Sequence, residues 1–245
     1  MSEKKFVFAG APYSNSAPLV EKLMEVDPRA RVINDHPSQL VEDLITGRAD
    51  VALIPVAHLF SHPELVMLKG LGIAADGPVK SVLLKCNVPV SEIKTVERDP
   101  ASATSNALAE LLLKKHYGRE IGMVEYAADA TVVIGDRALL SDPAPAGDID
   151  LAEAWKEMTG LPFVFAVWAV RKNFTEIETV SEIVHKAYLA GLQSLEVIAA
   201  RYADDIGNSI VFWFDYLNET IHYELGKRDM DGLGAFRGFI DGICR

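Results

Sequence analysis

The chain has 245 residues, of which 49% are hydrophobic and 24% charged, and its formal net charge at pH 7 is −11. This length and composition predict a globular protein with one large or two small domains and ample core. The acidic balance argues against nucleic-acid binding, which needs a basic surface. No segment approaches the roughly 18 apolar residues of a membrane span, and the N-terminal segment does not have the pattern of an export signal. We expect a cytoplasmic protein with no membrane or nucleic-acid partner.

The first part of the chain alternates between strand and helix patterns. Each helix pattern has a start signal, such as Ser16-Ala17-Pro18 or His36-Pro37-Ser38, followed by apolar residues on one face. Gly47 follows the second pattern, where glycine often ends a helix. This order predicts parallel strands joined by right-handed crossovers. The predicted strands are residues 6–9, 31–34 and 51–54, and the predicted helices lie between them.

The middle of the chain starts a second unit of the same kind. A weak strand at residues 95–97 is followed by the polar segment 101–105 and a helix pattern that Gly118 closes. Strands are predicted at 124–126 and 131–134, and the proline-, glycine- and alanine-rich segment 141–150 is predicted to be a loop.

Two apolar runs border this middle segment. Each follows a glycine- and proline-containing turn, at Asp76-Gly77-Pro78 and at Gly160-Leu161-Pro162. Unbroken apolar runs are typical of strands buried on both faces of a parallel sheet. We interpret the two runs as crossings between two lobes, with helices at 179–202, 206–225 and 233–243 completing the first lobe.

This arrangement predicts an α/β protein with the two-lobed fold of the periplasmic-binding-protein type (type II). Lobe I is expected to comprise residues 1–84 and 168–245, and lobe II residues 85–167. In such folds ligands bind in a cleft where strand ends and helix N-termini meet. We therefore looked for functional residues at the strand ends.

Four segments at strand ends carry candidate residues. Asn15 can donate and accept hydrogen bonds, and Ser81 follows the first turn. A third segment can hold a carboxylate, through two or three hydroxyls at the N-terminus of a helix. Its residues are Ser102, Thr104 and Ser105. Each segment also has a purely local interpretation, as an Asx turn, a plain turn or a helix cap. The fourth candidate is Gly135-Asp136, where Asp136 is either a base or an ordinary turn residue.

Other motifs do not reach the spacing that their chemistry requires. His58 and His62 are four residues apart but do not have the glutamate of the zinc-protease helix. Gly70-Leu71-Gly72 does not complete a dinucleotide fingerprint, and no nucleophile elbow is present. Two cysteines, Cys86 and Cys244, are too few for a disulfide framework. We expect no metal ion and no cofactor.

Several ordered motifs together resemble the chorismate dehydratases of the futalosine route to menaquinone. The resemblance extends over residues 6–240. The sequence departs from the family's usual pattern at Ser14 and at Val56-Ala57-His58. The two specific motifs are Asp76-Gly77-Pro78-Val79-Lys80-Ser81-Val82 and Thr159-Gly160-Leu161-Pro162-Phe163-Val164-Phe165-Ala166-Val167-Trp168; supporting motifs are Pro12-Tyr13-Ser14-Asn15, Pro37-Ser38-Gln39-Leu40, Asp50–Pro55, Ser102-Ala103-Thr104-Ser105 and Ile134-Gly135-Asp136.

The resemblance implies removal of water from chorismate to give 3-[(1-carboxyvinyl)oxy]benzoate, without a redox cofactor. On this hypothesis Asn15, Ser81 and Asp136 are catalytic. The expected substrate-binding residues are Ser38, Ser102, Thr104, Ser105 and Gly135. The proton acceptor is either Asp136 or a carboxylate of the substrate itself.

Three other interpretations remain open at this point. The sister enzyme that makes 1,4-dihydroxy-6-naphthoate shares the fold, although the turn at residues 76–82 resembles the dehydratase better. A solute receptor is the non-enzymatic alternative, and an effector-sensing domain of a transcription regulator is the third. We expect the protein to be a monomer or a homodimer.

Overall fold

The computed structural model describes residues 4–243, except for the side chains of Ser38 and Ile243. The chain forms two compact units. Unit 1 consists of the residues up to Ile73 together with Ala166–Leu225, and unit 2 consists of Ala74–Phe165 together with the residues from Gly226. The chain therefore passes between the units within two strands and once more after Leu225.

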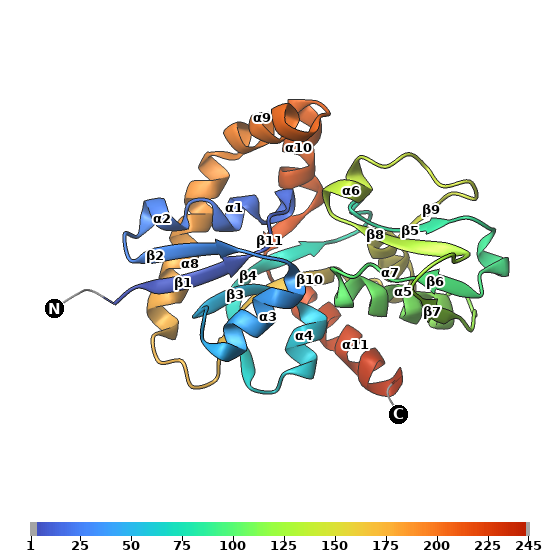
Figure 1. The fold of residues 1–245 in the computed structure, drawn as a ribbon, viewed down its shortest axis with the longest axis horizontal. Helices are drawn as coiled ribbons and strands as arrows, with labels where there is room; N and C mark the ends of the chain where they lie inside the picture. The colour runs from blue at the N-terminus through green and yellow to red at the C-terminus, as the bar shows by residue number, and fades with distance from the viewer. Residues whose placement is uncertain (1–3, 244–245) are drawn as a thin grey trace. The chain divides into compact units, whose positions relative to one another are not determined.

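Unit 1 contains a six-stranded sheet in the order β11-β4-β10-β3-β1-β2. In Figure 1, α3 lies in front of these strands and α8 runs behind them. The strands are β1 (Phe6–Gly10), β2 (Ala30–Asn34), β3 (Val51–Pro55), β4 (Leu65–Ala75), β10 (Phe163–Arg171) and β11 (His222–Glu224). The helices are the 3₁₀ turn η1 (Ser14–Ser16), α1 (Ala17–Val20), α2 (Leu23–Val26), α3 (Pro37–Thr46), α4 (Val56–Ser61), α8 (Ile177–Gln193), α9 (Leu195–Ile206), α10 (Ile210–Asp215) and the π-helical turn η3 (Tyr216–Thr220).

The first three strands pair as the sequence predicted. β1 is parallel to both β2 and β3, with Phe8 opposite Val32 on one side and Val51 on the other. The predicted C′ glycine of α3, Gly47, has a φ of 80°, in the left-handed region that glycine adopts readily. The parallel β-α-β-α-β start of the chain is confirmed.

The core of unit 1 follows from the apolar face of α3. Leu40 and Leu44 are fully buried against small residues of the sheet, among them Ala9 and Ala52. Phe8 precedes Ala9 in β1 and points to the other face of the sheet. There its ring meets the Trp168 ring edge-on, with 6.2 Å between ring centroids. Because successive strand residues point to opposite faces, β1 contributes to the packing on both faces of the sheet.

Unit 2 contains a five-stranded sheet in the order β7-β6-β8-β5-β9. Helix α5 packs against α7 and also contacts β8 and α11, and Figure 1 shows α5 and α7 beside these strands. The strands are β5 (Val82–Cys86), β6 (Thr95–Glu97), β7 (Gly122–Val124), β8 (Ala130–Ile134) and β9 (Asp148–Asp150). The helices are the 3₁₀ turn η2 (Val90–Glu92), α5 (Ala103–Lys115), α6 (Asp136–Leu139), α7 (Leu151–Thr159) and α11 (Lys227–Ile243).

The direction predicted for the two apolar runs is wrong. β10 is antiparallel to β3, with Trp168 opposite Leu53, and β5 is antiparallel to both β8 and β9. The runs are strands with buried residues, as expected, but burial on both faces carries no information about direction. Both sheets are therefore mixed.

The division of the chain differs from the expected lobe boundaries at three places, one of which is small: Ala166 and Val167 belong to unit 1 and not to lobe II. Residues 74–84 and those from Gly226 belong to unit 2, whereas the sequence analysis assigned both to lobe I. The segment from Gly226 belongs to unit 2 because of the aromatic cluster of α11: the Phe236 ring lies 5.9 Å from the Trp155 ring and 4.8 Å from the Phe163 ring, between centroids.

Several element boundaries also differ from the predicted ones. The first predicted helix is interrupted into η1, α1 and α2, and the helix expected at 206–225 is α10, a π-helical turn and β11. The predicted loop at 141–150 ends in the short strand β9.

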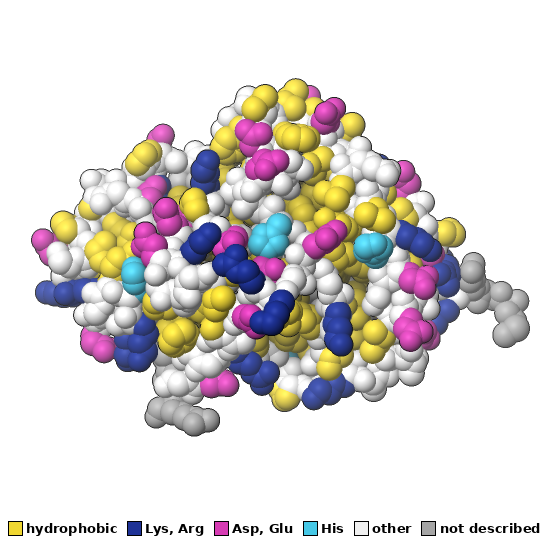
Figure 2. All heavy atoms as spheres, turned by 180° about the vertical axis from the view of Figure 1, so that it is seen from behind, with side chains coloured by type: hydrophobic (Ala, Val, Ile, Leu, Met, Phe, Trp, Pro, Cys, Tyr) yellow, Lys and Arg dark blue, Asp and Glu magenta, His cyan; other side chains and the backbone are white. Residues whose placement is uncertain are grey.

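Apolar side chains on α9 and α10 are exposed, including Val197 at 72% and Val211 at 67%, and yellow side chains are visible over this region in Figure 2.

No helix within the described part of the chain is both long and apolar enough to cross a lipid bilayer.

We predict that Gly191→Ala destabilises unit 1. A Cβ at Gly191 of α8 would lie 2.0 Å from the backbone oxygen of Pro18 in α1, so the two helices would have to move apart. Overpacking of this kind costs about 1–3 kcal/mol or more, which lowers the melting temperature of a chain of this size by several degrees. The measurement is thermal unfolding followed by circular dichroism.

The matched control is Gly234→Ala in α11, where a Cβ would meet no atom within 4 Å. This variant should melt at the wild-type temperature or slightly above it, because alanine is favoured over glycine inside a helix by about 1 kcal/mol. Equal melting temperatures for the two variants would contradict the close approach of α8 and α1.

Candidate functional site

Ser81 and Gly135 lie next to each other at one edge of the unit 2 sheet. The backbone N–H of Gly135 donates a hydrogen bond of 2.8 Å to the carbonyl of Ser81. This contact continues the β5–β8 ladder, in which Val82 is opposite Ile134. Ser81 is buried, with 1% of its surface exposed. The structure thus brings together two candidate segments that are more than fifty residues apart.

Asp136 begins the short helix α6 directly after this contact. Gly135 has φ 66° and ψ −149°, a backbone conformation that is nearly exclusive to glycine. The sharp turn that results places Asp136 at the same sheet edge as Ser81, and its side chain is half-buried.

The polar start of α5 is a buried, capped helix N-terminus. The Ser102 hydroxyl oxygen accepts a hydrogen bond of 3.1 Å from the N–H of Ser105 and donates one of 2.8 Å to the Ser105 hydroxyl. Ser102, Thr104 and Ser105 are all at most 6% exposed. The local interpretation therefore holds for Ser102, which caps the helix, while the dipole of the first turn still favours an anion.

The start of α5 lies at the same edge as Ser81 and Asp136. β6 runs parallel to β8, with Glu97 opposite Thr131, so the segments that follow these two strands leave from the same side of the sheet. Three of the four candidate segments therefore converge on this edge of unit 2.

Sequence reasoning missed an ion pair that links two of these segments. Arg137 Nη2 of α6 lies 2.6 Å from Asp99 Oδ2, which precedes α5. The Asp99 side chain also accepts a bond from the N–H of Ala101, and Asn106 bonds the backbone N–H and carbonyl of Asp99. The only sequence signal was Asp99-Pro100, which is typical of an ordinary turn.

The remaining candidates, Asn15 and Ser38, belong to unit 1. Asn15 is half-buried in η1 between the buried Ser14 and Ser16. The Ser16 hydroxyl lies 2.6 Å from the carbonyl oxygen of Ala11 and 2.8 Å from that of Tyr13, which holds this loop after β1. Ser38 is the second residue of α3, and its side chain lies outside the described residues.

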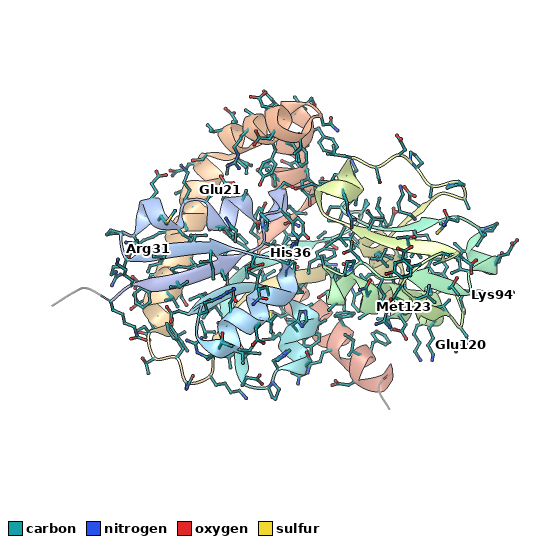
Figure 3. All side chains as sticks on the ribbon, in the orientation of Figure 1. Glu21, Arg31, His36, Lys94, Glu120 and Met123 are labelled. Carbon is teal, nitrogen blue, oxygen red and sulfur yellow. The ribbon has the colours of Figure 1, made fainter. Side chains whose placement is uncertain are left out.

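A hollow of about 490 Å³ lies beside η1 within unit 1. Asn15 is not part of its lining, although its neighbours Tyr13 and Ser16 are. Arg201 of α9 forms an ion pair with Glu21 at the end of α1 and lies over the Tyr202 ring; Glu21 is labelled in Figure 3. The lining comprises Ala11, Pro12, Tyr13, Ser16, Ala17, Val20, Glu21, Met24, Val32, Asn34, Arg201 and Tyr202.

The side chains set aside in the sequence analysis have local environments. Burial lowers the pKa of His58, whose carbonyl lies 2.8 Å from His62 Nδ1. Burial raises the pKa of the Cys86 thiol to about 11, so at neutral pH it is protonated and a poor nucleophile. Among residues 4–243, no three or more His, Cys, Asp or Glu side chains gather as a possible metal site.

Comparison with known proteins identifies the family of the chain. A protein-family model described as menaquinone biosynthesis matches residues 8–241. The chain belongs to this menaquinone biosynthesis family. It is 30% identical to a chorismate dehydratase from Thermus thermophilus, over 95% of this chain and 94% of the relative. It is 33% identical to a chorismate dehydratase from Campylobacter jejuni, over 82% and 79% of the two chains.

Solved structures confirm the predicted fold class. A protein from Archaeoglobus fulgidus has a TM-score of 0.76 at 15% identity and covers 97% of both chains. The periplasmic aliphatic sulphonate binding protein from Escherichia coli has a TM-score of 0.66 at 14% identity, over 99% of this chain and 94% of that one. At such identities the likeness shows the fold alone, which is that of the periplasmic binding proteins.

We predict that the Asp99–Arg137 ion pair stabilises the edge of the unit 2 sheet where Ser81, Asp136 and the start of α5 lie. Arg137→Met should destabilise the protein by about 1–3 kcal/mol, because the buried Asp99 carboxylate then loses its charged partner. Asp99→Asn should lower the free energy of unfolding by less in the Arg137→Met variant than in the wild-type protein. The measurement is a double-mutant cycle by urea unfolding, and a coupling energy of zero would show that the pair does not act as a unit.

Proposed function

We propose that the chain is a chorismate dehydratase, a carbon–oxygen lyase that converts chorismate into 3-[(1-carboxyvinyl)oxy]benzoate. One observation carries the proposal: Ser81, Asp136 and the start of α5 share one sheet edge in a chain 30% identical to a chorismate dehydratase over 95% of its length. The two relatives named above support both the reaction type and the substrate.

The chemistry needs few groups from the protein. The ring carboxylate activates the C3 hydrogen of chorismate through the intervening C1=C2 double bond. A base removes this proton, the C3–H electron pair forms a new ring double bond, and the C4 hydroxyl leaves, so that the elements of water are lost. The product ring is aromatic, which makes the elimination strongly favourable. No cofactor has to accept or donate electrons.

The start of α5 is proposed to bind a substrate carboxylate. Thr104 and Ser105 lie in its first turn, where the helix dipole and hydroxyl donors favour a negative charge. Charge that spreads into the ring carboxylate during C–H cleavage would be stabilised there. Gly135 contributes through the turn that its backbone makes before Asp136, and Ser102 contributes indirectly, by capping the helix.

Ser81 and Asn15 are proposed to orient the reacting bonds. The Ser81 backbone is fixed by its bond from Gly135, and Asn15 can offer both a donor and an acceptor. Holding the enolpyruvyl arm or the departing hydroxyl in one geometry lowers the entropy lost on reaching the transition state. Ser38 is proposed to contribute to substrate binding from the start of α3.

The decisive experiment uses the purified protein and chorismate alone. The aromatic product is followed by absorbance and identified by mass spectrometry. Conversion without added metal or cofactor supports the dehydratase. Binding of chorismate without conversion would instead favour a small-carboxylate receptor.

We predict that Asn15→Asp lowers kcat/KM by at least 100-fold, because it places a negative charge beside a dianionic substrate. The matched control is Asn87→Asp, which adds the same charge at an exposed residue of unit 2 and should leave kcat/KM close to the wild-type value. A near-normal kcat/KM for Asn15→Asp would remove Asn15 from the site.

The proton acceptor can be identified with Asp136→Asn. A general base contributes about 10²–10⁴-fold to a rate, so a loss of this size in kcat assigns the role to Asp136. A kcat within a few-fold of the wild-type value assigns it to the substrate's own side-chain carboxylate. Thermal unfolding of the variant provides the control for folding.

A further inference from the structure

We propose that Asp150 is a positioning residue for Ser81: its carboxylate holds the turn that precedes Ser81 in the conformation that the reaction requires. This inference rests on the proposed function, in which Ser81 contacts the substrate. Asp150 lies at the junction of β9 and α7, about seventy residues further along the chain, and no sequence motif pointed to it.

The Asp150 carboxylate joins two separate pieces of backbone. Oδ2 accepts hydrogen bonds of 2.8 Å from the N–H of Val79 and 2.6 Å from the N–H of Lys80. Oδ1 accepts bonds of 3.0 and 3.2 Å from the N–H groups of Ala152 and Glu153. One oxygen therefore holds the turn before Ser81, and the other caps α7.

The turn needs such a restraint because its backbone is unfavourable for its residues. Lys80 has a φ of 62° although it is not glycine, and a side chain with a Cβ disfavours this left-handed conformation. The Lys80 N–H that Asp150 binds belongs to the same residue whose φ is strained. Losing this acceptor would allow Lys80 to relax toward a negative φ, which would reorient Ser81, the next residue.

The other parts of the turn are already anchored. The Asp76 carboxylate at its start forms ion pairs with Lys156 Nζ at 3.0 Å and Arg228 Nη1 at 2.9 Å. At its end, Ser81 is bonded through its carbonyl to Gly135. The Asp150 bonds act on the segment between these two anchors, where the strained residue lies.

The capping role and the positioning role of Asp150 can be separated by substitution. Asp150→Ser keeps a good N-cap oxygen for α7, but the shorter side chain has no second oxygen for Val79 and Lys80. Asp150→Ala removes both contacts. Asp150→Asn keeps one carbonyl oxygen and replaces the other acceptor with an NH₂ group, and it serves as a third variant if one of the others does not fold.

Asp129 offers a matched control in the same unit. Asp129 Oδ2 also accepts bonds from two consecutive backbone N–H groups, those of Lys94 and Thr95, at 2.9 Å each. It precedes β8, however, whereas Gly135 follows β8, so it lies at the opposite edge of the sheet from Ser81. Asp129→Ser should lower stability but leave kcat near the wild-type value.

The first measurement is steady-state turnover of chorismate. We expect kcat to fall by about 10- to 100-fold in Asp150→Ser, the size expected for a misplaced reacting group, and equally in Asp150→Ala. The melting temperature should be lower in Asp150→Ala than in Asp150→Ser. Wild-type kcat in Asp150→Ser, with a loss only in Asp150→Ala, would overturn the inference by showing that Asp150 acts through the α7 cap.

The second measurement does not depend on activity. Hydrogen–deuterium exchange of a peptide covering residues 76–82 should be faster in Asp150→Ser than in wild type, and unchanged in Asp129→Ser. Unchanged exchange in Asp150→Ser would overturn the inference. If wild-type protein does not convert chorismate at all, the proposed function fails, and the exchange result still decides whether Asp150 holds the turn.

Discussion

Strand β8 pairs antiparallel with β5 on one side and parallel with β6 on the other. This double pairing is the constraint that brings Ser81, Asp136 and the start of α5 to one edge of the unit 2 sheet. Segments that follow β6 and β8, and the segment that precedes β5, all leave from the same side of the sheet. Slipping any register by one residue would turn the strand's side chains to the opposite face, so the apolar core also fixes the positions of the polar loops.

Carboxylates organise the loops of this acidic chain. Asp150 binds backbone N–H groups on both sides of its carboxylate, Asp129 ties the start of β6 to that of β8, and Asp50 accepts the N–H of Val7 in β1. A charged acceptor makes stronger hydrogen bonds than a neutral one. The net charge of −11 therefore includes groups that serve local structure, and an anionic ligand has to be held by local groups rather than by the overall field.

The sequence placed the candidate residues at strand ends and helix starts, and the structure brings three of the four candidate segments to one edge of the unit 2 sheet. The turn at Gly135, the cap at Ser102 and the parallel start of the chain all follow from short-range rules. The direction of β10 could not be predicted, since an apolar run indicates burial but not direction. The unit to which α11 belongs could not be predicted either, because a closing helix can pack against either unit. The ion pair of Asp99 with Arg137 and the contacts of Asp150 join segments far apart in the chain, which no local pattern shows.

The sequence by itself determined the fold class and the residue types available at each strand end, because these depend on periodicity and on local backbone preferences, and its motifs carried the resemblance to the family. Only the tertiary structure decided which polar groups of distant segments meet: that Arg137 pairs with Asp99, that Ser81 is bonded to Gly135, and that Asp150 holds a left-handed Lys80. The physical reason is that a hydrogen bond between distant segments exists only once strand register and direction have placed donor and acceptor within about 3 Å of each other.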